Sequence, residues 1–339
     1  MSDAPYGYRI VGSVEGRRRL VDAGAALAAY AACDAAAQVD HEAYLSAFQF
    51  PTEFRDYLTS TGSTRGYDGR CWSSWLWFDI DREGDLDAAL LDARRLVGRL
   101  LQVYRSLDDD DVLAFFSGSK GYHVGLPLPA ALPPSTTFHR VGRKLAETVA
   151  DQAGARIDAG VYDCVRAFRA PNSRHPRTGL HKRRLTHDEL MRLSAARIVE
   201  RAKEPAPFDL PPPAADPQLA TDWADAAELV EREQRAKAQR RADTAAGNGR
   251  LTRRTIQTIR GEDIDIGDRH RLLFSAAANL AELGCPAALA HELLTEAGLD
   301  AGLPPAEVRR QIDCGLAHGV AGLVPADAVA APVTHPAAG

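Results

Sequence analysis

The chain has 339 residues, 45% of them hydrophobic and 26% charged, and its formal net charge at pH 7 is −5. This length and apolar content are enough for two domain cores, and the net negative charge excludes a uniform electrostatic attraction to nucleic acid. The chain has no run of 18 apolar residues, and its first 20 residues are not those of a signal peptide. We therefore expect a cytoplasmic protein without a membrane partner.

The cysteines do not indicate a disulfide framework or a four-thiolate zinc site. They are odd in number, far apart and never in a CxxC spacing. The five positions are Cys33, Cys71, Cys164, Cys285 and Cys314. A zinc site that combines Cys71 or Cys164 with His175 or His181 stays open, and the sequence does not decide whether a Cys/His zinc site exists.

The first third of the chain predicts helix, strand and helix in turn. Residues 17–58 are rich in alanine and carry an apolar face of small residues, which indicates helix. Residues 75–78 form a short, fully apolar run with three aromatic side chains, so we predict a buried strand that Asp79 and Asp81 end. Apolar residues recur at helical spacing over residues 86–104, which predicts a helix of about five turns.

The next segments predict a hairpin followed by another helix. Residues 111–118 indicate a strand and residues 123–128 indicate its return. Residues 135–154 predict a helix for which Ser135 or Thr136 is the N-cap. Because strands alternate with helices over the first two hundred residues, we predict an α/β or α+β fold for this region.

A proline-rich segment, residues 205–217, predicts a domain boundary because it can form neither a helix nor a central strand. We expect a first domain over residues 1–205, a linker and charged helix over residues 206–249, and a small all-helical bundle over residues 250–320. The tail, residues 321–339, is rich in alanine and proline and is expected to be disordered.

Two carboxylates lie at the end of the first predicted strand. Asp79 and Asp81 are two residues apart, so both leave the same face of the strand with their Cα atoms about 7 Å apart. A divalent cation offsets their repulsion, and an all-oxygen ligand set favours Mg²⁺ or Mn²⁺ over zinc. Such a pair of acids is also common where a strand turns into a helix, so the pair alone does not distinguish a metal site from an ordinary strand end.

The second motif is the turn Ser117-Gly118-Ser119-Lys120-Gly121, which interrupts two strand-like runs and is followed by His123. Glycines let backbone N–H groups approach a ligand closely, and the lysine adds a positive charge. The pattern is typical of a turn that binds phosphate, although an ordinary hairpin gives a similar composition.

A third acid, Asp158, is followed by a basic segment. Residues 166–184 contain seven basic side chains and no acid, so we expect a cationic surface that suits a polyanion. Three acids, a phosphate-type turn, a histidine on the returning strand and a group of arginines are the parts that metal-dependent nucleotidyl transfer needs.

Taken in order, these motifs resemble those of the archaeo-eukaryotic primase superfamily, in particular primase-polymerases of plasmids, phages and mobile elements. Asp79-Ile80-Asp81 resembles its acid-x-acid motif, residues 117–123 resemble its Ser-Gly-x-x-Gly-x-His signature, and Ile157-Asp158 resembles its later lone acid. The resemblance covers roughly residues 60–190. More weakly, residues 250–320 resemble the small helical domain that follows the catalytic domain in many mobile-element primases.

The resemblance implies an α+β catalytic domain with an RRM-like mixed sheet flanked by helices, and a two-metal site for Mg²⁺ or Mn²⁺. By it, the metal ligands would be Asp79, Asp81 and Asp158, with His123 beside the reacting triphosphate. Nucleotide-binding side chains would be Ser117, Ser119, Lys120, His123, Arg166 and Arg169. Since a planar guanidinium binds phosphate oxygens in pairs, Arg169 is the preferred arginine. We expect the template backbone to be bound by Arg174, Lys182, Arg183 and Arg184.

The expected function is that of a DNA primase or primase-polymerase, which joins NTPs or dNTPs on a single-stranded DNA template without a primer. The alternatives are a primer-dependent repair polymerase and a catalytically silent replication-initiator module that binds nucleic acid. The sequence has no GxxxxGK[ST] motif, so unwinding would need a separate replicative helicase. It does not determine the preferred sugar, the template sequence, the oligomeric state or the choice between Mg²⁺ and Mn²⁺.

Overall fold

The computed structural model describes residues 5–211, 216–245, 250–262 and 267–321. The chain divides into two compact units, Met1–Val230 and Glu231–Gly339. Beyond Ala321, the tail predicted to be disordered lies outside the described residues. Among the helices of the described segments, none combines the length and hydrophobicity that crossing a bilayer requires.

The first unit contains two four-stranded sheets, in which every strand pair is antiparallel. The first sheet has the strand order β2 (Arg19–Asp22), β1 (Tyr6–Val11), β3 (Ala43–Ser46) and β7 (Ala167–Arg169). The second sheet has the order β4 (Trp75–Asp81), β6 (Gly121–Pro127), β5 (Leu113–Phe116) and β8 (Arg183–Leu185). The predicted α+β class is confirmed, with antiparallel sheets in place of a mixed one.

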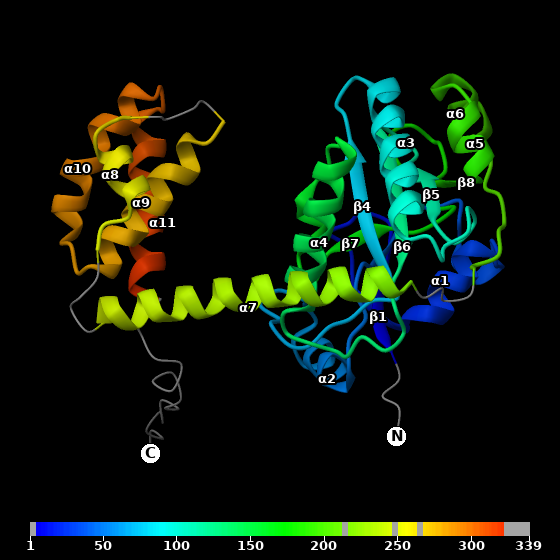
Figure 1. Ribbon diagram of the computed structural model, residues 1–339, viewed down its shortest axis with the longest axis horizontal. Helices are drawn as coiled ribbons and strands as arrows, with labels where there is room; N and C mark the ends of the chain where they lie inside the picture. The colour runs from blue at the N-terminus through cyan, green and yellow to red at the C-terminus, as the bar shows by residue number, and fades with distance from the viewer. Residues whose placement is uncertain (1–4, 212–215, 246–249, 263–266, 322–339) are drawn as a thin grey trace, which may run out of the picture. The chain divides into compact units, whose positions relative to one another are not determined.

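Helices of the first unit pack around these sheets. They are α1 (Ala23–Ala31), α2 (Thr52–Thr61), α3 (Leu86–Val103), α4 (Phe138–Ala153), α5 (His187–Arg192), α6 (Ala195–Arg201) and the beginning of α7 (Pro217–Ala245), with short 3₁₀ helices η1 (Ala35–Ala37) and η2 (Ala159–Tyr162). Helices α3 and α4 pack on the second sheet (Figure 1).

Both faces of β4 are buried, which explains its continuous apolar sequence. Leu76 packs against α4 at Gly142, and strand alternation places Phe78 and Ile80 on the same, helix-covered face. Asp79 and Asp81 therefore leave the opposite face. The strand ends at Asp81 and contains both acids, as predicted, and its pairing with β6 continues through Asp81.

The predicted N-terminus of helix α3 is confirmed, whereas that of helix α4 is not. Helix α3 begins at Leu86, where the Asp85 carboxylate accepts a hydrogen bond from the backbone N–H of Ala88 at 2.8 Å. The predicted N-caps of α4 are wrong, since this helix begins at Phe138 after Thr137. Ser135 instead forms a β-bridge with Cys71, so its backbone is extended.

The alanine-rich segment, residues 17–58, is not mainly helical as predicted. It contains helices α1 and α2, but β2, η1 and β3 lie among them, and β1 precedes them. Cys33 has a φ of 53°, which ends the helical run after α1. Alanine occurs in α1, in η1 and in strand β3 of this segment, so its alanine content did not distinguish helix from strand.

The packed core of the first unit includes residues from both sides of the proline-rich segment. The Phe208 ring lies 5.5 Å from that of Phe115. In α7, the buried Trp223 ring lies 4.6 Å from the Phe138 ring, and Leu219 and Val230 are also buried. The first part of α7 is thus a packed helix of this unit.

Trp223→Ala is expected to destabilise the first unit by about 3–5 kcal/mol, because it removes a large buried ring and leaves a cavity beside Phe138. Chemical denaturation followed by tryptophan fluorescence and circular dichroism measures this change. The matched control is Leu229→Ala, which shortens an exposed apolar side chain of the same helix and should change stability by no more than about 0.5 kcal/mol. Equal effects of the two substitutions would contradict the packing of α7.

The second unit is helical. After the end of α7 it contains α8 (Arg253–Ile259), α9 (Arg269–Glu282), α10 (Ala287–Asp300) and α11 (Pro305–Ala321). Its core includes Leu273, Leu294 and Ile312. The predicted helical character of this region is confirmed.

Candidate active site

The pairing of β4 with β6 brings the first two motifs together. In this register, Asp79 lies directly opposite His123, and Asp81 lies opposite Gly121. Residues that face each other across an antiparallel pair share one face of the sheet. Both acids and the histidine therefore lie on the face of the second sheet that α3 and α4 leave free, and Asp79 Oδ1 is 3.4 Å from His123 Nε2.

Asp79 and His123 are buried, with 9% and 6% of their surfaces exposed. The His123 ring packs on Phe168 of β7, with 4.3 Å between ring centroids. Burial, aided by the charge of Lys182, lowers the pKa of His123. Asp79 Oδ1 and His123 Nδ1 are buried without a hydrogen-bond partner, and orphaned polar atoms of this kind commonly mark a site for a ligand, ion or water.

The glycine turn forms as predicted and is held by its first serine. The backbone N–H of Ser117 donates to the Gly121 carbonyl at 2.9 Å, and the Ser117 hydroxyl accepts from the Gly121 N–H at 3.2 Å. Gly118 has a φ of +86°, which suits glycine. Because Ser117 is buried and its hydroxyl bonds the turn itself, it positions the turn, whereas Ser119 is half-buried and Lys120 is exposed.

Lys120 forms the electrostatic link between the turn and the acids. Its Nζ lies 3.0 Å from Asp81 Oδ2. The hydrogen bond to Asp81 and the charge of that carboxylate raise the pKa of Lys120, so the ammonium is charged at neutral pH. An exposed cation therefore stands beside Asp81.

The third motif lies against the edge of β4. The backbone N–H of Asp158 donates to the carbonyl of Asp79 at 2.7 Å, and its carboxylate caps η2 by accepting from the Gly160 N–H at 2.8 Å. Asp81, Lys120 and Asp158 line one open depression of about 640 Å³. The three predicted ligands nevertheless do not form a closed cluster, since their carboxylate oxygens are not all within 4.8 Å of one another.

Lys182 is the largest departure from the predicted site. It is only 1% exposed, its Nζ donates to the carbonyl of Arg169 at 2.8 Å, and it lies 4.3 Å from the ring centroid of Phe168. The rings of Trp77 and Phe115 lie within 5.3 and 4.8 Å of the same nitrogen. Burial lowers its pKa well below the ordinary value, while the charge of Asp79 opposes this. The prediction that Lys182 contacts the template is wrong, because its ammonium does not reach the surface.

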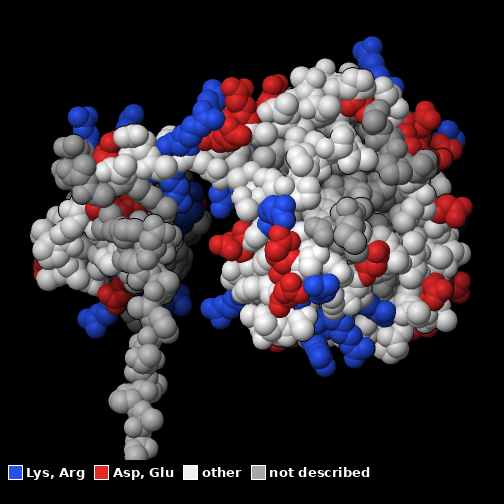
Figure 2. All heavy atoms as spheres, turned by 90° about the horizontal axis from the view of Figure 1, so that it is seen from below, with Lys and Arg blue, Asp and Glu red and all other residues white. Residues whose placement is uncertain are grey.

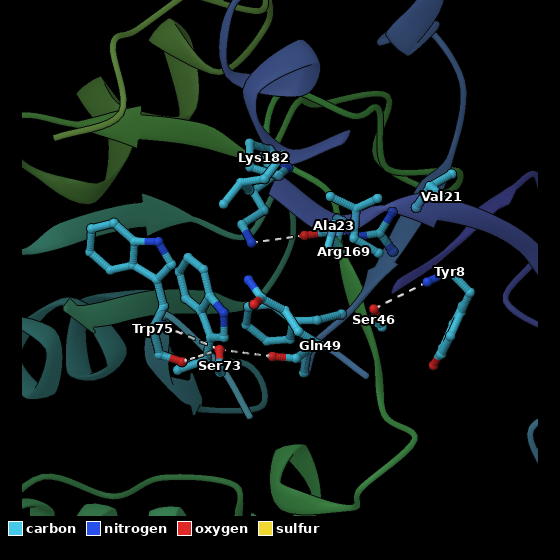
Figure 3. Close-up of a pocket in the computed structure, with 15 residues that line it drawn as sticks. Tyr8, Val21, Ala23, Ser46, Gln49, Ser73, Trp75, Arg169 and Lys182 are labelled. Atoms are coloured by element: carbon cyan, nitrogen blue, oxygen red, sulfur yellow. Dashed lines mark hydrogen bonds between the residues drawn. The ribbon is translucent and has the colours of Figure 1, made fainter. Parts of the chain in front are cut away.

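Lys182 also lines an interior pocket to which both sheets contribute (Figure 3). In the figure the Lys182 side chain points toward the Arg169 carbonyl, and Trp75 and Ser73 lie on the other side of the pocket. The pocket holds about 50 Å³, far less than the roughly 300–1,000 Å³ typical of ligand sites. The depression beside Asp81 is therefore the better size for a nucleotide.

The two candidate phosphate-binding arginines differ in their surroundings. The guanidinium of Arg169 lies 4.9 Å from the ring centroid of Tyr44, donates to the Tyr44 hydroxyl at 3.1 Å and is 4.0 Å from Glu42. Arg166 is exposed. Burial would raise the pKa of Asp79, but His123 first, and then the charges of Lys182 and Arg166, bring it below its ordinary value. The arrangement favours Arg166 over Arg169.

The other basic residues of segment 166–184 differ in how far they are exposed. Arg184 is half-buried and donates to the carbonyls of Val112 and Ala114, and burial lowers its pKa to about 10; its role at the template stays a prediction. Arg183 is half-buried and donates to the carbonyl of Glu204, whereas Arg174 is exposed. Blue and red side chains are interspersed on the face in Figure 2.

Comparison with models of known protein families found no match, and no curated protein matches the chain. Among solved structures, the chain is similar to the crystal structure of primase RepB′, with 16% sequence identity, coverage of 95% of this chain and 92% of that chain, and a TM-score of 0.33. The function has to be inferred from the side chains of the protein itself.

Proposed function

We propose that the protein is a DNA primase or primase-polymerase, a metal-dependent nucleotidyltransferase that starts a strand on single-stranded DNA. The observation that carries this proposal is the pairing of β4 with β6, which sets Asp79 opposite His123 and Asp81 beside Lys120. The bond from the Asp158 N–H to the Asp79 carbonyl adds the third motif to the same strand. Three motifs that are far apart in the chain thus meet where nucleotidyl transfer would need them.

The acidic residues fit Mg²⁺ or Mn²⁺. Asp79 Oδ1 is a buried oxygen without a hydrogen-bond partner, and Asp81 and Asp158 add carboxylates at the border of the depression. Hard divalent cations prefer such oxygen ligands. We assign Asp79, Asp81 and Asp158 as the residues that hold the metal, which when bound would activate the attacking hydroxyl and stabilise charge on the leaving pyrophosphate.

The remaining side chains would bind and orient the nucleotide. Lys120 stands at the depression with an exposed ammonium, and the backbone of the glycine turn lies beside it. Arg166 supplies a second exposed charge near Asp79. His123 sits on a rigid strand with Nε2 3.4 Å from Asp79 Oδ1 and would help to orient that carboxylate.

We assign Lys182 a positioning role behind the metal ligands. Its ammonium is enclosed by Trp77, Phe115 and Phe168, and its charge acts on both Asp79 and His123. Template binding is assigned to the exposed Arg174 and the half-buried Arg183 and Arg184. Because unwinding motifs are missing from the sequence, a separate replicative helicase is the expected partner.

Lys120→Ala is expected to raise the KM for the nucleoside triphosphate by about 10- to 100-fold, because one hydrogen bond between charged groups is worth roughly 1.5–3 kcal/mol. The free energy of unfolding should change by less than about 1 kcal/mol, since the pair with Asp81 is exposed. Steady-state incorporation over a range of nucleotide concentrations measures the effect. Lys203→Ala removes another exposed ion pair, with Glu200, and should leave KM unchanged; equal KM values for both variants would contradict the assignment.

The function is tested with the full chain, labelled nucleotides and an unprimed single-stranded DNA template in Mg²⁺ or Mn²⁺. We expect products that need both template and cation, that disappear with a chelator and that return when Mg²⁺ is restored. Products that require an added primer would identify a repair polymerase instead. Binding of single-stranded DNA without any incorporation would identify a silent initiator module and reject the proposal.

A further inference from the structure

Three potential metal ligands converge in the first unit outside the candidate active site. They are Cys71, His139 and Cys164, whose ligand atoms all lie within 4.8 Å of one another. Cys71 Sγ is 4.0 Å from His139 Nδ1. Within the described parts of the chain, no other group of three or more cysteine, histidine or acidic side chains is gathered as closely.

Hydrogen bonds outside the three side chains bring the segments that carry Cys71, His139 and Cys164 together. Cys71 and Ser135 exchange N–H···O bonds of 3.1 and 3.0 Å, which fixes Cys71 beside the start of α4, where His139 occupies the first turn. Cys164 follows η2, and the hydroxyl of Tyr162 at the end of η2 donates to the carbonyl of Trp77 in β4 at 2.8 Å. The fold therefore positions all three ligands independently of their side chains.

The spacing suits a tetrahedral metal. Zinc bonds of about 2.3 Å to sulfur and about 2.0–2.1 Å to nitrogen place the two ligand atoms about 3.6 Å apart at a tetrahedral angle. The 4.0 Å between Cys71 Sγ and His139 Nδ1 is within a few tenths of an ångström of this value. Two sulfur ligands and one imidazole favour zinc over Mg²⁺ or Mn²⁺.

The surroundings of the three side chains favour a metal site over two cysteines that merely pack against each other. Cys71 is fully buried and Cys164 is 6% exposed, whereas His139 is half-buried, so solvent can reach one side of the cluster. The imidazole interacts with both thiols. Packed cysteines alone would not require a histidine that contacts both sulfur atoms.

We propose that Cys71, His139 and Cys164 bind one Zn²⁺ ion, with water as the fourth ligand. Binding deprotonates the two thiols, so the affinity rises with pH. The ion would tie together the segment entering β4, the first turn of α4 and the segment between Asp158 and Arg166. This proposal does not depend on the proposed polymerase function.

Zinc is measured by inductively coupled plasma mass spectrometry on the full chain after removal of loosely bound metal. We expect about one zinc per chain in the wild type, and at least a tenfold lower content in Cys164→Ser and His139→Ala. Cys314→Ser changes an exposed cysteine of the second unit and should retain the wild-type content. Circular dichroism shows whether the variants remain folded.

A second measurement does not depend on any variant. Wild-type protein stripped of metal is titrated with Co²⁺, and we expect a sulfur-to-cobalt charge-transfer absorption that saturates at one equivalent and disappears when Zn²⁺ is added. Absence of both zinc and this absorption would overturn the proposal. So would unchanged zinc in both folded ligand variants, or a Cys71–Cys164 disulfide as the dominant species in peptide mass spectrometry.

Discussion

Replacing Asp79 by asparagine is expected to abolish nucleotide incorporation while the first unit stays folded. The substitution keeps the shape of the side chain but removes the negative charge from a buried carboxylate whose Oδ1 accepts no hydrogen bond and lies 3.4 Å from His123 Nε2. Loss of an outer-shell partner of a metal typically costs about 10- to 100-fold in affinity or activity, so loss of a ligand should cost more than about 100-fold. The measurements are single-turnover incorporation and thermal unfolding of the same preparation.

A metal titration separates this role from a merely structural one. If Asp79 holds the cation, any residual activity of Asp79→Asn should require a higher concentration of Mn²⁺ for half-maximal rate than the wild type does. Asp151→Asn, an exposed carboxylate near the end of α4, is the control and should behave like the wild type. A wild-type rate and metal dependence in Asp79→Asn would rule out the metal assignment.

The parts of the fold that the sequence predicted best are those with a strong local pattern. The apolar run of β4, the helical repeat of α3 and the hairpin of β5 and β6 are all present. What the sequence could not provide is register. A shift of one residue between β4 and β6 would place Asp79 and His123 on opposite faces, and no local signal distinguishes the two alignments.

The surroundings of Lys182 and the cysteine cluster could not be predicted from the sequence, because both depend on contacts between residues far apart in the chain. A lysine in a basic run is usually solvated, and the rings that enclose Lys182 come from β4, β5 and β7. For a zinc site, the sequence suggested His175 or His181 as the partner of Cys71 or Cys164. His181 bonds the carbonyl of Asn172 through Nδ1 at 2.7 Å, whereas His139, on a helix far away in sequence, is the one that reaches Cys71.

The register itself can be tested at Gly121. A Cβ atom there would lie far inside contact distance of the Ile80 carbonyl oxygen and only 2.5 Å from Asp81 Oδ1. Because the nearest obstacle is backbone of the paired strand, no side-chain rotation relieves the overlap. Gly121→Ala is therefore expected to lower the free energy of unfolding by at least about 3 kcal/mol and to reduce incorporation even at temperatures where the protein stays folded.

Gly98→Ala is the matched control for this substitution. Gly98 is exposed in α3, and an added Cβ meets nothing within 4 Å, so alanine should stabilise the helix by about 0.5–1 kcal/mol. Urea denaturation should show a lower free energy of unfolding for Gly121→Ala and a higher one for Gly98→Ala than for the wild type. If Gly121→Ala were as stable as Gly98→Ala, Asp81 would not face Gly121 across the strand pair, and the placement of the acids beside Lys120 and His123 would have to be abandoned.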